Sequence, residues 1–171
     1  MLLAVIITSI VILIALMFYL KSLEKKKYHA NSYLFHLQKA MEFMAVVNNF
    51  NDYITWVERD RIKSKYDETG RFFLNKAKFY KKEVTVKKFN EVFQNFDGFI
   101  AAYNKYYVRN VKETLKDFFE NIEGKKLDDQ QQTAVATDEY SNLIIAGAGS
   151  GKTLTILGKV KYLIEKKNID P

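Results

Sequence analysis

The feature that most restricts the fold of this chain is a short apolar run that breaks into a glycine-rich loop. Residues 143–145, Leu-Ile-Ile, form the run, and residues 146–153 follow as Ala-Gly-Ala-Gly-Ser-Gly-Lys-Thr. An apolar run of this length that ends at glycine is typical of a buried strand. Apolar residues then recur every three or four positions over residues 154–164, which predicts a helix with one buried face. A strand, a glycine loop and a helix in this order predict an α/β fold.

The loop has the composition of a phosphate-binding loop. Several backbone N–H groups must turn inward together to wrap a triphosphate, so we expect side chains at positions 147, 149 and 151 to block the loop. Lys152 is expected to contact the β and γ phosphates, and the hydroxyl of Thr153 to bind Mg²⁺, which makes these two residues the catalytic candidates. A glycine-rich turn that binds nothing is the alternative. The candidate binding residues of the loop are Ala146, Gly147, Ala148, Gly149, Ser150, Gly151, Lys152 and Thr153, with alanine at the position where the stricter pattern has glycine.

A second motif precedes the loop over residues 127–135, Leu-Asp-Asp-Gln-Gln-Gln-Thr-Ala-Val. The two motifs together closely resemble the opening of the superfamily 1 DNA helicases typified by UvrD and Rep. In that family a glutamine at the position of Gln131 reads adenine, and a carboxamide suits this role because it both accepts and donates hydrogen bonds. The resemblance implies a RecA-like P-loop NTPase domain that begins at residue 127 and uses ATP and Mg²⁺. Residues 101–123 resemble, more weakly, the approach to the motor in the helicase IV branch.

The resemblance also implies residues that this sequence does not contain. In the family, an acidic pair that binds magnesium and arginines from a second motor domain all lie downstream of the loop. No strand ending in paired acids follows Thr153, and residues 128–129 lie upstream, where they suit a helix cap. We therefore expect the truncated N-terminal portion of a longer enzyme that unwinds DNA 3′ to 5′, on single strands or duplexes with a single-stranded tail. The alternative is a catalytically inactive, membrane-anchored nucleotide-binding or helical interaction module.

The N-terminal segment reads as a membrane span. Residues 2–20 carry no charged side chain, and a helix of that length, at about 1.5 Å per residue, just reaches across a hydrocarbon core of about 30 Å. A buried core helix is the alternative. The basic segment 21–28 follows directly, so the positive-inside bias predicts an N-terminus outside the cell and a cytoplasmic C-terminal part. The sequence therefore predicts a single-pass protein of the cell membrane, anchored by a transmembrane helix over residues 1–20.

The region between the span and the motifs, residues 29–123, is predicted to be mostly α-helical. Its clearest pattern is an apolar stripe over residues 85–123, which predicts one long amphipathic helix. Residues 59–88 mix basic and aromatic side chains, a composition that suits nucleic-acid contact or, equally, a helix with a solvated lysine face. The net charge of +7 fits a polyanionic partner, and the absence of cysteine excludes disulfides and cysteine metal sites.

Overall fold

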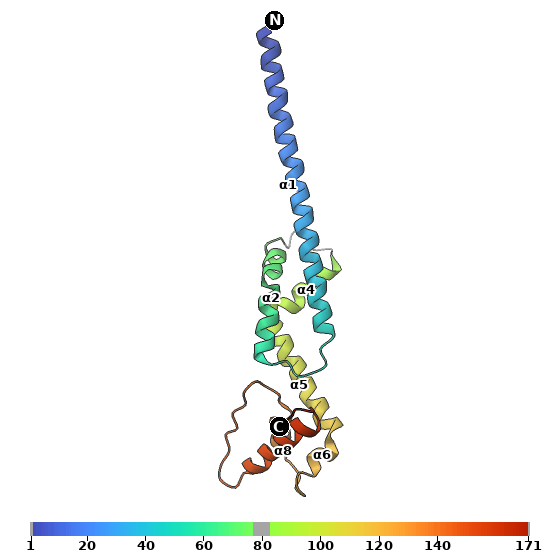
Figure 1. Cartoon of the computed structure of the whole chain (residues 1–171), viewed down its shortest axis with the longest axis vertical. Coiled ribbons are helices and arrows are strands. Elements are labelled where there is room, and N and C mark those ends of the chain that lie inside the picture. Colours follow the sequence, from blue (N-terminus) through green and yellow to red (C-terminus); the bar gives the residue numbers. More distant parts are fainter. Residues whose placement is uncertain (1, 77–82, 171) are drawn as a thin grey trace.

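The computed structural model describes residues 2–76 and 83–170, with side chains described from residue 12 onward. In Figure 1, α1 projects as a long rod, α2 and α4 lie beside its C-terminal half, and α5 leads down to a second group that contains α6 and α8. The segment between α7 and α8 runs as an open loop at the side of this second group. The helices of the described part are α1 (Leu2–Asn48), α2 (Trp56–Asn75), α4 (Val84–Gln94), α5 (Phe96–Thr114), α6 (Lys116–Glu120), α7 (Asp129–Ala136) and α8 (Lys152–Glu165).

Two helices begin at capping boxes that the local sequence encodes. The Thr55 hydroxyl accepts from the backbone N–H of Glu58 at 3.2 Å, and the Glu58 carboxylate accepts in return from the N–H of Thr55 at 3.0 Å. Asp128 and Gln131 make the same exchange at the start of α7, at 2.8 and 2.9 Å. Each exchange satisfies N–H groups that the first helical turn leaves without a partner, so these residues fix where α2 and α7 begin.

The first hydrophobic core joins α1, α2, α4 and the start of α5. Phe43 of α1 lies at its centre, fully buried, and its ring meets those of Tyr66, Phe89 and Phe96 edge to face at 5.2 to 5.4 Å. Edge-to-face pairs are a favoured arrangement for aromatic rings. The buried residues of this core are Ala40, Phe43, Val47, Ile54, Tyr66, Phe73, Val86, Phe89, Phe96 and Ile100.

The second core joins the end of α5 with α6, α7 and α8, and it holds the helices that flank the glycine loop. Gly158 of α8 allows close packing here, because a Cβ at this position would lie 3.0 Å from the Leu127 side chain. The buried residues of this core are Val111, Phe119, Ile122, Leu127, Val135, Ala136 and Tyr162. The position of α8 relative to α7 therefore depends on this small cluster.

The predicted α/β fold is wrong for this structure, since all the regular elements of residues 2–76 and 83–170 are helices. The expected strand over residues 143–145 is an irregular segment, with Leu143 86% and Ile145 87% exposed. A strand is stable only when its backbone groups hydrogen-bond to a neighbouring strand. The described residues supply no such neighbour, so the apolar run stays in an open loop.

The predicted membrane span is also wrong. Residues 2–20 belong to α1, a single helix of 47 residues that continues without a break through Lys21, Glu24 and the lysines that follow. Among the described helices, none combines the length and the apolarity that crossing a bilayer requires. The side chains of residues 1–11, which fall within the predicted span, lie outside the described part. The cytoplasmic placement of the C-terminal part stays a prediction.

The long helix expected over residues 85–123 is divided into α4, α5 and α6. The breaks fall at Asn95, with φ −117° and ψ 38°, and at Leu115, with φ −102° and ψ 30°. The apolar stripe is divided in the same way, because Phe89 and Phe96 enter the first core whereas Val111 and Phe119 enter the second. A straight helix presents one face in one direction, so the breaks let a single stripe serve two cores.

Candidate functional site

The glycine loop ends where α8 begins. Gly151 is the residue before the first turn of α8, with φ +81°, and Gly149 has φ +76°. Residues other than glycine rarely adopt this left-handed backbone conformation, so the φ angles explain why glycine occupies both positions. Gly147 differs, because it lies outside the left-handed region and a Cβ there would have open space around it. The free loop therefore has room for a side chain at Gly147, whereas the backbone favours glycine at positions 149 and 151.

The Lys152 side chain folds back onto the loop. Its ammonium donates to the carbonyl oxygens of Ala146 at 2.7 Å and Gly147 at 2.8 Å. The Ser150 hydroxyl donates to the same Gly147 carbonyl at 2.8 Å. Lys152 and Ser150 are both exposed, so the loop is closed by its own polar side chains at the surface. Two carbonyl oxygens thus occupy the ammonium that we expect to meet phosphate.

The structure brings Gln131 against the loop from α7. The oxygen of its carboxamide caps α7 through Asp128, which leaves the NH₂ group free to donate to the Ser150 carbonyl at 3.2 Å. The contact is tight on the side of Gly151, where a Cβ would lie 2.5 Å from the Gln131 nitrogen. The two sequence motifs therefore meet in space across the α7–α8 contact. Thr153 and Ala148 are exposed.

Two lysines that sequence reasoning missed hold α8 in position. Lys159 donates to the carbonyls of Val135 and Thr137 at 3.0 and 2.9 Å and to the Asp138 carboxylate at 3.0 Å. These contacts bind the middle of α8 to the C-terminal end of α7, where carbonyl groups are unpaired and attract a cation. In the sequence Lys159 is one of 27 basic residues, and no local pattern distinguishes it.

Lys167, just after α8, connects the end of this helix to the helical region that precedes the motifs. It forms ion pairs with Asp52, in the segment between α1 and α2, and with Asp138 at 3.3 Å. Burial would lower the pKa of Lys167, but the hydrogen bond with Asp52 and the nearby negative charges raise the pKa above the usual lysine value. Burial, together with a hydrogen bond to Asp52, raises the pKa of Tyr107 to about 12. At neutral pH the Lys167 ammonium is therefore protonated and charged, and the Tyr107 phenol is protonated and neutral.

The described part of the chain contains no group of three or more His, Cys, Asp or Glu residues that could hold a metal ion. The predicted magnesium contact uses the Thr153 hydroxyl instead. That contact stays a prediction, as do the roles of Gln131 and of the loop residues 146–153.

Comparison with known proteins shows that the C-terminal segment is similar to a helicase N-terminal domain. The family is the UvrD/REP helicase N-terminal domain, and the match covers residues 127–171. This segment, which contains both motifs, is therefore similar to the UvrD-type superfamily 1 helicases, and the predicted resemblance is confirmed over this part of the chain. No solved structure matches the chain.

Curated relatives agree with the family match. A probable DNA helicase II homologue of Mycoplasma capricolum is 60% identical over 45 residues, which is 26% of this chain and 6% of that protein. DNA helicase IV of Escherichia coli is 33% identical over 69 residues, 40% of this chain and 10% of that protein. The ATP-dependent DNA helicase PcrA of Staphylococcus epidermidis is 43% identical over 47 residues, 28% of this chain and 6% of that protein. The chain thus spans a tenth or less of the length of these relatives.

Proposed function

We propose that this chain is the ATP-binding N-terminal part of a UvrD-like DNA helicase, which in its full form unwinds DNA 3′ to 5′ with ATP and Mg²⁺. The observation that carries the proposal is the contact of Gln131 with the loop at Ser150. Reading adenine and holding phosphates require a base-reading group beside a phosphate-binding loop. Similarity to proteins named as DNA helicases supports DNA as the partner of the full form.

The loop offers an anion the groups it needs. The backbone N–H groups of the first turn of α8 have no partner within the helix, and the helix dipole places partial positive charge at the same end. Lys152 now donates to two neutral carbonyl oxygens. Because charged phosphate oxygens are stronger acceptors than neutral carbonyls, we infer that a triphosphate draws the ammonium away from Ala146 and Gly147. Thr153, next to Lys152, is then in reach of a magnesium ion held by the phosphates.

The test is binding of a fluorescent ATP analogue by the purified chain, with and without Mg²⁺. Lys152→Ala removes a charge-assisted contact, so we expect the affinity to fall by roughly tenfold or more. Lys166→Ala is the matched control, because it removes the same charge from the opposite, exposed end of α8. Equal affinities in the Lys152→Ala variant and the wild type would refute the assignment of the loop.

A further inference from the structure

A cavity of about 580 Å³ lies apart from the glycine loop, between the start of α2, the face of α5 and the end of α7. None of residues 146–153 lines it. Its volume falls within the range of ligand sites, which is roughly 300–1,000 Å³. The cavity belongs largely to the helical region that precedes the UvrD/REP match, where neither the motifs nor the relatives assign a role.

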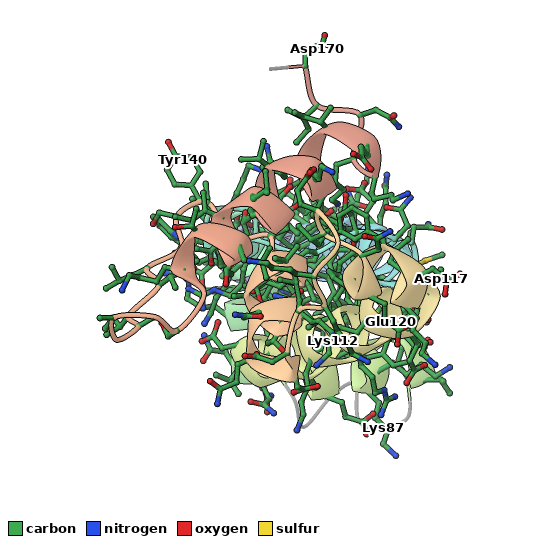
Figure 2. All side chains as sticks on the ribbon, turned by 90° about the horizontal axis from the view of Figure 1, so that it is seen from below. Lys87, Lys112, Asp117, Glu120, Tyr140 and Asp170 are labelled. Atoms are coloured by element: carbon green, nitrogen blue, oxygen red, sulfur yellow. The ribbon has the colours of Figure 1, made fainter. Side chains whose placement is uncertain are left out.

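The floor of the cavity is apolar and one edge is aromatic. Ile54 and Ile100 are buried, and Val108 is partly buried beside them. Trp56, at the first position of α2, is 48% exposed, and Tyr140 lies edge-on to it at 6.3 Å. Figure 2 shows Tyr140 projecting from the edge of the molecule. A half-exposed indole in the lining of a partly apolar cavity is a side chain on which a flat ring can stack.

The other wall of the cavity is basic. Lys105 and Arg109 lie one turn apart on α5, both exposed, and among the described residues neither forms an ion pair with a carboxylate. Arg109 instead lies over the ring of Tyr106 at 5.5 Å. Two cations spaced by one helical turn, about 5.4 Å along the axis, are placed to contact neighbouring phosphates of one strand.

The acidic residues of the lining are already engaged. Asp97 forms ion pairs with Lys63 at 2.9 Å and Arg59 at 3.6 Å. The Glu139 carboxylate accepts from the backbone N–H of Trp56 at 3.2 Å and from the Tyr53 hydroxyl at 3.4 Å. Lys105 and Arg109 are therefore left as the cations of this wall that an external anion can neutralise.

We propose that this cavity binds a short segment of single-stranded DNA, with a base stacked on Trp56 and the phosphates on Lys105 and Arg109. The combination of an apolar floor, an exposed indole and two unpaired cations matches the stacking surface and charged groove by which single strands are bound. A duplex does not fit, because its bases are stacked on each other and not available to the indole. This proposal rests on the proposed DNA-binding function. It adds a DNA contact that lies outside the two motifs of the UvrD/REP segment.

Trp56 is the only tryptophan in the chain, so its fluorescence reports on this cavity directly. The experiment titrates the full chain, without nucleotide, with a single strand of about ten thymidylates, a length within the usual site size. We expect saturable quenching of Trp56 by the single strand and little quenching by a duplex of equal length. The Lys105→Ala/Arg109→Ala double variant should bind a labelled copy of the strand at least about tenfold more weakly, with a reduced dependence on salt.

Lys88→Ala/Lys116→Ala is the matched control, because it removes two exposed charges from α4 and α6, which do not line the cavity. Equal weakening by the two double variants, or binding of the labelled strand without quenching of Trp56, would overturn the proposal. Equal quenching by the duplex would overturn it as well. The result is separable from the outcome at the nucleotide site, because Lys152 does not line the cavity and the strand is titrated without nucleotide.

Discussion

Substituting each glycine of the loop by alanine tests how the loop is built. The three positions form a graded series. Gly147 has neither a left-handed backbone nor a close neighbour, Gly149 has φ +76° in open space, and Gly151 has φ +81° together with a Cβ position 2.5 Å from the Gln131 nitrogen. The series therefore separates backbone strain from the loss of the Gln131 contact.

The expected magnitudes follow from these geometries. Alanine at Gly147 should be neutral, or stabilising by roughly 0.4–1 kcal/mol through the unfolded state. At Gly149 the left-handed backbone costs alanine about 1–2 kcal/mol. At Gly151 the same cost applies, and displacing the Gln131 carboxamide from Ser150 adds roughly 0.5–1.5 kcal/mol for the lost hydrogen bond. The total at Gly151 is then about 1.5–3.5 kcal/mol.

The assay combines urea unfolding with binding of the ATP analogue for each of the three variants. Strain that is present in the free loop lowers the free energy of unfolding. Strain that appears only when the loop closes on phosphate lowers the free energy of analogue binding instead. For each variant the losses in these two free energies are therefore added. We expect the summed loss to rise from Gly147→Ala through Gly149→Ala to Gly151→Ala. Equal summed losses at Gly147 and Gly151 would refute the reasoning.

Three further predictions address the core, the adenine reader and the response to pH. Phe43→Ala should lower the free energy of unfolding by about 3–5 kcal/mol, because the ring is fully buried; urea denaturation measures this, and Phe35→Ala, at an exposed ring, is the control. Gln131→Ala should lower the preference for ATP over GTP by roughly two- to tenfold, through one lost hydrogen bond, with Gln130→Ala as control; an unchanged ratio would place adenine recognition elsewhere. For Tyr107, whose pKa is raised from 10.0 to about 12, the folded state favours the neutral phenol, so the stabilisation is complete below pH 10 and is lost as the pH rises towards 12. Between pH 10 and 12 the melting temperature of Tyr107→Phe should therefore fall less than that of the wild type, whereas a Tyr106→Phe control should fall as the wild type does. Equal falls in all three proteins would contradict the assignment.

Local sequence was sufficient where the physical cause is local. Thr55 and Glu58, or Asp128 and Gln131, are three residues apart, so the capping exchange that begins α2 and α7 is available from the residues themselves. The positive φ angles of Gly149 and Gly151 belong to the same category, because only glycine adopts them without strain. The resemblance of residues 127–171 to the UvrD-type helicases was likewise readable from two short motifs.

Tertiary structure decided the features that depend on distant partners. Residues 143–145 have the composition of a strand, but a strand needs a neighbour, and the described residues provide none. Apolar spacing predicted one helix over residues 85–123, whereas the presence of two cores divided it at Asn95 and Leu115. The apolar residues 2–20 became the first part of a helix that continues far into charged sequence.

The candidate site shows the same division. The sequence by itself predicted which residues would carry the chemistry, because Gln131, Lys152 and Thr153 are marked by their spacing to the glycines. Only the folded chain decided that Gln131 donates to Ser150, that Lys152 rests on the loop's own carbonyls, and that Lys159 joins α8 to the end of α7. These contacts join residues that lie apart in the sequence, and packing of the second core is what brings them within hydrogen-bonding distance.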